Sequence, residues 1–94
     1  MTVKLKDGRK LVVKMPMKKT FEKMTALQGA ESSDMTAEDA MDTLGGLCAE
    51  ILSNNMNGER ITAEEITENY DIEEMEAMVE TYMDFAGGVK NDPN

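Results

Sequence analysis

The most apolar long segment of this 94-residue chain is residues 36–52, TAEDAMDTLGGLCAEIL. Its apolar residues recur at steps of one, three and four, which is the spacing of one face of an α-helix. These residues are Ala37, Ala40, Met41, Leu44, Leu47, Cys48, Ile51 and Leu52. Thr36 is a suitable N-cap, and Asp39 follows three residues later. We therefore expect a core helix over residues 36–53, around which the other elements pack.

The glycine pair Gly45-Gly46 lies in the middle of this segment. Inside a helix each glycine costs about 1 kcal/mol relative to alanine. A kink at the pair, or a helix that begins after it, is one interpretation. The apolar stripe keeps its phase across the pair, however, so we favour a continuous helix against which another segment packs closely.

Residues 2–15 are predicted to form a β-hairpin, because two alternating segments flank an Asp-Gly turn. A two-residue loop would split the apolar residues between the two faces. A three-residue loop with Gly8 in a left-handed conformation pairs Val3 with Leu11 instead. This register places on one face Val3, Leu5, Leu11, Val13 and Met15. An isolated hairpin is marginally stable, so either the helices of the chain or a second subunit must cover this face.

Three further helices follow from local signals. Residues 17–28 have helical spacing, and residues 29–35 read as a loop. Capping boxes at positions 62–65 and 71–74 open helices over residues 62–69 and 71–86. The last of these has an inner stripe of Ile72, Met75, Met78, Val79, Tyr82, Met83 and Ala86.

The pair Gly87-Gly88 is expected to end this last helix in the manner of a C-cap, leaving residues 89–94 as a disordered tail. The fold class is then α+β and mainly α. We expect one small domain over residues 1–88, in which an N-terminal β-hairpin is followed by three or four packed helices.

Charge is distributed unevenly along the chain. Residues 1–23 hold eight of the ten Lys and Arg with only two acids, a net charge of +6, whereas the remainder holds two cations and seventeen acids, a net charge of −15. Opposite charges at two ends favour head-to-tail association between copies, so a homo-oligomer is expected, although charge runs are also ordinary solvated faces. Nucleic-acid binding is not expected, because the net charge of −9 repels phosphate.

Catalytic chemistry has few candidates in this sequence. There is no His, and no phosphate-binding Gly-rich loop, zinc-ligand spacing or catalytic triad can be assembled. Cys48 lies on the apolar stripe, where a buried structural thiol is the expected role. We therefore expect no enzymatic activity, cofactor or metal. A single Cys and the lack of a membrane-spanning run or a signal sequence predict a soluble cytoplasmic protein.

The segment NNMNGERITAEE, which lies between two predicted helices, has some features of a calcium-binding loop. Setting Gly58 at position 6 of such a loop places at its ligand positions Ser53, Asn55, Asn57 and Glu64. Three of these are uncharged, and Arg60 occupies a position that is usually apolar. One carboxylate predicts very weak calcium binding at best, so this interpretation is not favoured.

The order of elements resembles the tail assembly chaperones of long-tailed (siphovirus-type) phages and prophages of Gram-positive bacteria. The similar features are a short β N-terminus (VKLKDGRKLVVKM), a helix ending in ALQ, an acidic loop, the long apolar helix AMDTLGGLCAEIL, and the G-x-x-I-T-x-E-E-I segment at residues 58–66, which leads into a terminal helix ending in Gly-Gly. The resemblance covers nearly the whole chain and carries over no binding residue.

This resemblance implies a non-enzymatic protein of the bacterial host cytoplasm that binds the tape-measure protein during tail morphogenesis. The major tail protein, which forms the tail tube, is a further candidate partner. Such chaperones keep the long, aggregation-prone tape measure soluble, and they are often made in two lengths through a ribosomal frameshift near the end of the gene. Flexible Met side chains suit a partner with many similar segments.

Candidate interface residues are those of the two predicted apolar faces: Val3, Leu5, Leu11, Val13, Met75, Met78 and Tyr82. For each of them, packing inside the core of the chain is the other interpretation. A different functional class also remains, a small acidic regulatory adaptor or inhibitor that mimics nucleic acid and binds a basic DNA-handling protein. Its affinity would fall steeply as salt rises.

Overall fold

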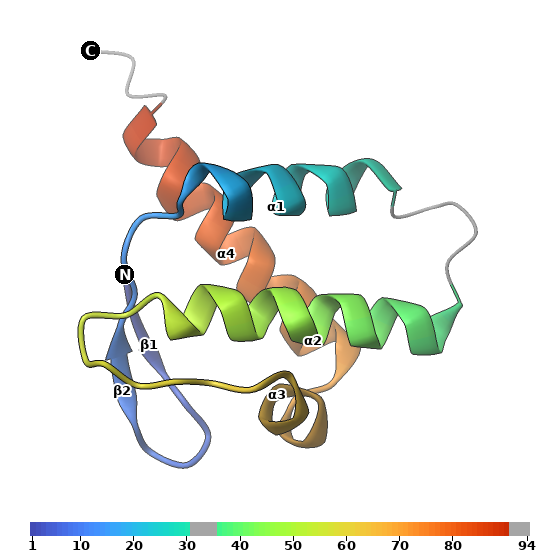
Figure 1. Cartoon of the computed structure of the whole chain (residues 1–94), viewed down its shortest axis with the longest axis horizontal. Coiled ribbons are helices and arrows are strands. Elements are labelled where there is room, and N and C mark those ends of the chain that lie inside the picture. The colour runs from blue at the N-terminus through green and yellow to red at the C-terminus, as the bar shows by residue number, and fades with distance from the viewer. Residues whose placement is uncertain (31–35, 91–94) are drawn as a thin grey trace.

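The computed structural model of the chain describes residues 1–30 and 36–90. Residues 31–35, part of the predicted loop, and residues 91–94, part of the predicted tail, lie outside the described residues. An antiparallel pair of strands is followed by four helices. The elements are β1 (Thr2–Lys4), β2 (Lys10–Val12), α1 (Lys18–Ala30), α2 (Ala37–Ser53), α3 (Ala63–Asn69) and α4 (Ile72–Lys90) (Figure 1). The predicted mainly helical α+β fold is confirmed.

The hairpin has the predicted register. Val3 pairs with Leu11, the Leu5 N–H donates to the Arg9 carbonyl at 2.8 Å, and Gly8 has a φ of 101°. A positive φ at this position is readily adopted only by glycine, which explains the three-residue loop. Met15 differs from the prediction, since it lies beyond both the sheet and the isolated bridge at Val13 and is 43% exposed.

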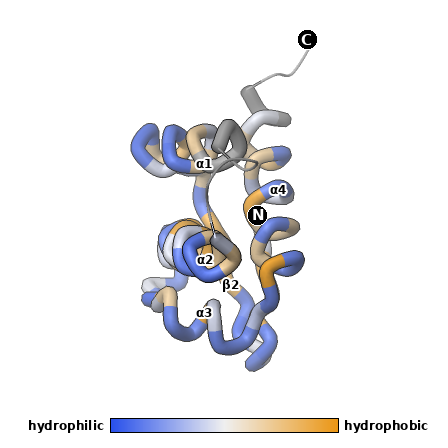
Figure 2. Tube along the Cα trace, turned by 90° about the vertical axis from the view of Figure 1, so that its right-hand side faces the viewer, coloured by the Kyte–Doolittle hydropathy of each residue, from blue (hydrophilic) through white to orange (hydrophobic). Residues whose placement is uncertain are grey.

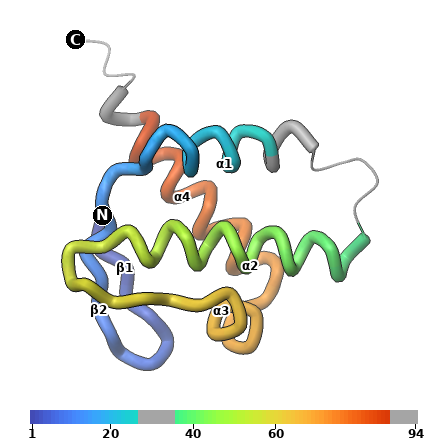
Figure 3. Tube along the Cα trace, viewed as in Figure 1, coloured from blue at the N-terminus to red at the C-terminus, as the bar shows by residue number. Residues whose placement is uncertain are grey.

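The outer edge of β2 is covered by the segment that follows α2. Val13 forms a bridge with Asn55, the Met56 N–H donates to the Val12 carbonyl at 2.8 Å, and the Lys14 N–H donates to the Asn54 carbonyl at 2.8 Å. Figure 3 shows this segment passing β2 before it runs back beneath α2 to α3. Within the described residues, β2 therefore lies between two backbone neighbours, whereas β1 has one.

Asn55 organises this connection between α2 and α3. Its side-chain oxygen accepts hydrogen bonds from the Asn57 and Glu59 N–H groups at 2.9 and 3.1 Å, and its side-chain nitrogen donates to the Leu52 and Glu59 carbonyls. The Ser53 hydroxyl likewise bonds both backbone groups of Ile61. Two of the residues considered for a calcium loop thus use their oxygens to hold the chain's own backbone.

Helix α2 is the centre of the structure, as predicted. It contacts each of the other three helices and begins at the expected cap, where the Thr36 hydroxyl accepts from the Asp39 N–H at 3.1 Å. The helix is continuous through the glycine pair. A Cβ on Gly45 would lie 2.5 Å from Thr67 Cγ2, whereas one on Gly46 would meet nothing within 4 Å. The predicted close approach is therefore real at Gly45, and α3 makes it.

The helices form two layers. Figure 2 shows α1, α2 and α3 stacked on one side of the molecule and α4 on the other. In Figure 1, α1 and α2 run antiparallel, and α4 crosses behind them. The largest fully buried side chains come from both layers and from the hairpin: Tyr82, Leu11, Met24, Ile51, Leu52, Ile66, Met75, Val13 and Cys48.

Helix α4 starts at the predicted capping box. The Glu74 N–H donates to Asp71 Oδ1 at 2.7 Å, and the Asp71 N–H donates to Glu74 Oε1 at 2.9 Å. The prediction that Gly87-Gly88 ends the helix was wrong, because α4 continues to Lys90. Glycine keeps its N–H donor, so it weakens a helix without breaking it. Helix α1 also runs past the predicted end, to Ala30.

Candidate interaction surface

Five of the seven candidate interface residues are buried inside the chain. They are Leu5, Leu11, Val13, Met75 and Tyr82, each no more than 4% exposed. The helices of the chain itself cover the hairpin face at Leu5, Leu11 and Val13, which is one of the two interpretations given above. The two α4 residues pack in the same core. Val3 and Met78 differ from them, because both pack against the core yet remain half-buried. The candidate surface therefore narrows to the region around these two side chains.

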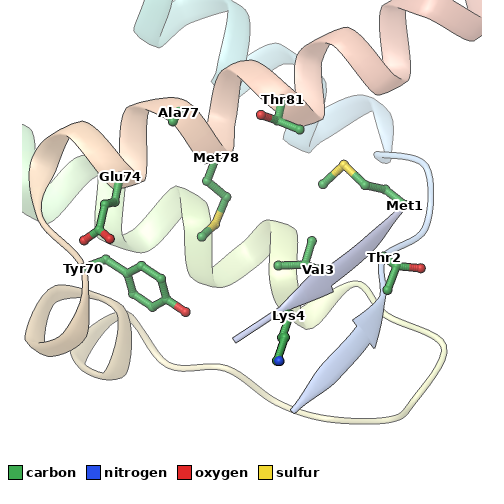
Figure 4. A pocket seen from close by; sticks show the side chains of 9 residues that line it. All are labelled: Met1, Thr2, Val3, Lys4, Tyr70, Glu74, Ala77, Met78 and Thr81. Carbon is green, nitrogen blue, oxygen red and sulfur yellow. The ribbon is translucent and has the colours of Figure 1, made fainter. Parts of the chain in front are cut away.

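Val3 and Met78 line an open groove of about 420 Å³ between β1 and α4 (Figure 4). Its lining residues are Met1, Thr2, Val3, Lys4, Tyr70, Glu74, Ala77, Met78 and Thr81. The four α4 residues among them follow helical spacing and so share one face of that helix. Periodicity identified Met78, but the contributions of Met1, Tyr70 and Ala77 depend on tertiary packing and carry no local signal.

The groove is apolar and adaptable at its centre. Figure 4 shows the side chains of Met1, Val3 and Met78 in the space between β1 and α4. Methionine is unbranched and flexible, so it can fit partner side chains of different shape. The groove can therefore accept apolar side chains without requiring one fixed sequence.

One wall of the groove is an open strand edge. Met1 exchanges backbone hydrogen bonds with Val13, and the Leu5 N–H donates to the Arg9 carbonyl. The backbone N–H and C=O groups of the odd-numbered residues of the β1 segment therefore point toward β2. In an antiparallel pair the backbone groups of the intervening residues, Thr2 and Lys4, then point away from β2. These outer groups have no hydrogen-bond partner in the parts of the chain that the structure describes. An added strand could bond them.

Lys6 contacts two of the residues that line the groove, Tyr70 and Glu74. Its N–H donates to Tyr70 Oη at 3.1 Å, and its Nζ lies 4.7 Å from the centre of the same ring. Nζ also donates to the Asn69 carbonyl at 2.6 Å and to Glu74 Oε1 at 2.9 Å. The Lys6 ammonium, followed by the Asp71 N–H, lowers the pKa of Glu74 below its ordinary value. These bonds attach the end of the hairpin to the start of α4.

The groove is not lined by a thiol. The chain's one thiol, Cys48, is buried under α4, where its Sγ lies 3.6 Å from the Met75 carbonyl, and burial raises its pKa to about 12. At neutral pH it is therefore protonated and out of reach. Among residues 1–30 and 36–90 there is no group of three or more His, Cys, Asp or Glu that could hold a metal ion. Likewise, no helix in this described part is long and apolar enough to span a bilayer.

Comparisons of the chain with models of known protein families, with curated proteins and with solved structures find no match. The role of the groove must therefore follow from its own chemistry. Apolar side chains beside unpaired backbone groups are a combination by which proteins recognise other polypeptides, since the edge supplies affinity and the side chains supply selectivity.

Proposed function

We propose that this protein is a phage tail assembly chaperone, a non-enzymatic protein that binds the tape-measure protein during tail morphogenesis. The observation that carries the binding role is the groove between β1 and α4, where Val3 and Met78 lie beside an open strand edge. The choice of partner follows from the resemblance in element order described above. The major tail protein is the second partner of the proposal.

The properties of the groove suit a partner that is long and repetitive. A tape measure offers many similar apolar segments, and a methionine-lined groove can bind several of them with comparable affinity. The net charge of −9 would keep the resulting complex soluble, because charged surfaces resist association. Transient covering of apolar segments is then a binding event that needs no catalytic residue.

Co-expression tests this proposal. The protein is produced together with the product of the longest open reading frame directly downstream of its gene, and the soluble fraction is captured by an affinity tag on the small protein. We expect the long protein to become soluble and to co-purify. If it remains insoluble and unbound, also with the longer frameshifted product of the gene, the chaperone proposal is wrong. Salt-sensitive binding to a basic DNA-handling protein instead would support the acidic adaptor.

A matched pair of variants tests the groove itself. Ala77 lines the groove and is exposed, so Ala77→Arg places a long cation in the groove without removing a core contact. Ala26 is an exposed alanine on α1, away from the groove, and Ala26→Arg is the control. We expect capture of the long protein to fall at least about tenfold for Ala77→Arg only. Equal capture by both variants would show that the binding site lies outside the groove.

A further inference from the structure

The face of the hairpin that is turned away from the core is both basic and apolar. Cross-strand pairing places Lys4 opposite Lys10 and Thr2 opposite Val12, and all four are exposed. The exposed Lys14 follows two residues after Val12, and the Met56 N–H bonds the Val12 carbonyl. We call this surface the basic face and define it as Lys4, Lys10, Val12, Lys14 and Met56.

The cations of the basic face lack counter-charges within the chain. In the described ranges 1–30 and 36–90, Lys6, Arg9 and Lys23 form ion pairs, whereas the three lysines of the basic face form none. Like charges directly opposite each other on neighbouring strands are destabilising. Val12 and Met56, with exposed fractions of 41% and 73%, add apolar surface between these cations. The face thus has the composition of a binding site for an acidic partner.

An acidic counterpart is present on the same molecule. Helix α4 carries Glu73, Glu76, Glu80 and Asp84 at steps of three and four, so they lie along one side of the helix, and all are exposed. None of them is in an ion pair within the described part of the chain, unlike Glu74, which binds Lys6. We call these residues the acidic stripe.

The two surfaces have similar lengths. At a rise of about 1.5 Å per residue, the acidic stripe extends over about 16 Å. At about 3.3 Å per residue, the strand from Lys10 to Lys14 extends over about 13 Å. Two or three acid–lysine pairs could therefore form at once if the helix lay along the strand.

We propose that the basic face of one copy binds the acidic stripe of a second copy. Both surfaces are exposed within a single chain, so each copy keeps one of each available. A contact between two different surfaces is heterologous, and its repetition produces an open chain or a closed ring. This inference rests on the charge complementarity of the two surfaces and does not depend on the chaperone proposal.

Charge reversal tests the contact. One variant carries Lys10→Glu and Lys14→Glu, a second carries Glu76→Lys and Glu80→Lys, and a control carries Glu22→Lys and Asp42→Lys on exposed positions of α1 and α2. Sedimentation velocity at about 0.05 M salt reports the assembly state, and raising the salt to about 0.5 M screens the contact. We expect concentration-dependent oligomers for the unchanged protein and for the control, and monomers for each of the first two variants, with self-affinity reduced at least about tenfold.

A mixture of the two charge-reversed variants provides the decisive test. An equimolar mixture of the first two variants offers a complementary pair of surfaces, so we expect association to return. The control has the same net charge as the second variant but keeps both surfaces, so its association should match that of the unchanged protein and show that net charge alone does not dissociate the oligomer. The inference is wrong if the unchanged protein stays monomeric at low salt, if both reversed variants associate normally, if their mixture does not associate, or if the control dissociates like the second variant. Should a reversal unfold the chain, the milder Lys10→Gln, Lys14→Gln variant must show the same weakening.

Discussion

Alanine substitutions at the two adjacent glycines of α2 test how closely α3 packs against this helix, and each substitution is the control for the other. Gly45 and Gly46 lie in the same helix, so alanine gains about the same helix propensity at either position, about 1 kcal/mol. At Gly46 the new Cβ meets nothing within 4 Å. Gly46→Ala should therefore raise the free energy of unfolding by about 0.5–1 kcal/mol.

At Gly45 the new Cβ would lie 2.5 Å from Thr67 Cγ2 and 3.6 Å from the Ala63 carbonyl oxygen. Carbon atoms prefer a separation of about 3.5–4.0 Å, so α3 must move by about 1 Å or Thr67 must rotate. Rotation is restricted because Thr67 is β-branched and its hydroxyl bonds the Glu64 carbonyl. Overpacking of this kind costs about 1–3 kcal/mol. Since the propensity gain cancels, Gly45→Ala should be less stable than Gly46→Ala by that amount.

Urea unfolding followed by far-UV circular dichroism measures this difference. A third variant, Gly45→Ala with Thr67→Ser, removes the obstructing methyl group and should recover most of the lost stability, relative to Thr67→Ser alone. Equal stability of the two single alanine variants would refute the close approach of α3. Failure of the serine substitution to rescue would show that Thr67 is not the obstacle.

Three further predictions concern other parts of the chain. Asn55→Ala leaves two backbone N–H groups in the connection unpaired, so it should lower the free energy of unfolding by about 2–4 kcal/mol. Asn57→Ala removes one exposed hydrogen bond and should lower it by less than about 1 kcal/mol in the same urea assay. Burial raises the pKa of Cys48 to about 12, so its reaction with a thiol reagent at neutral pH should require unfolding and become faster as urea is added. A fast reaction in native buffer would contradict this burial. Lys6 lowers the pKa of Glu74 below its ordinary value of 4.5, so their ion pair stabilises the fold above that pH and loses its contribution as the pH falls through the folded-state value. The stability difference between the unchanged protein and Lys6→Met should therefore shrink as the pH falls below 4.5. A constant difference would show that the ion pair is not the cause.

The features that could be predicted from sequence are those with local causes. The hairpin register followed from the requirement that Val3, Leu11 and their neighbours share a face, and Gly8 supplied the turn. Helix starts followed from capping side chains such as Asp71, whose partners lie three residues away. Helix ends were less predictable, because a glycine pair such as Gly87-Gly88 lowers helix stability without preventing further hydrogen bonds.

The candidate site could be predicted only in part. Periodicity placed Met75 and Met78 on one apolar face of a helix, but it could not tell which would be buried, since that depends on where the hairpin packs. Tyr70 lines the groove, and its hydroxyl accepts a hydrogen bond from Lys6, which is distant in sequence. The role of Asn55 was missed although its side-chain partners lie only two to four residues away. Only its bridge to Val13 depends on a distant residue.

Methionine-methyl nuclear magnetic resonance tests the central claim, that the groove between β1 and α4 binds a tape-measure segment. Fragments of the downstream long protein are titrated into the chaperone candidate with isotope-labelled methionine methyl groups. The account predicts that the Met78 signal, from the groove, shifts on binding, whereas those of Met17 and Met56, which are 69% and 73% exposed and lie outside the groove, stay in place. Binding that shifts Met17 or Met56 and leaves Met78 unchanged would contradict it, as would the absence of binding by every fragment.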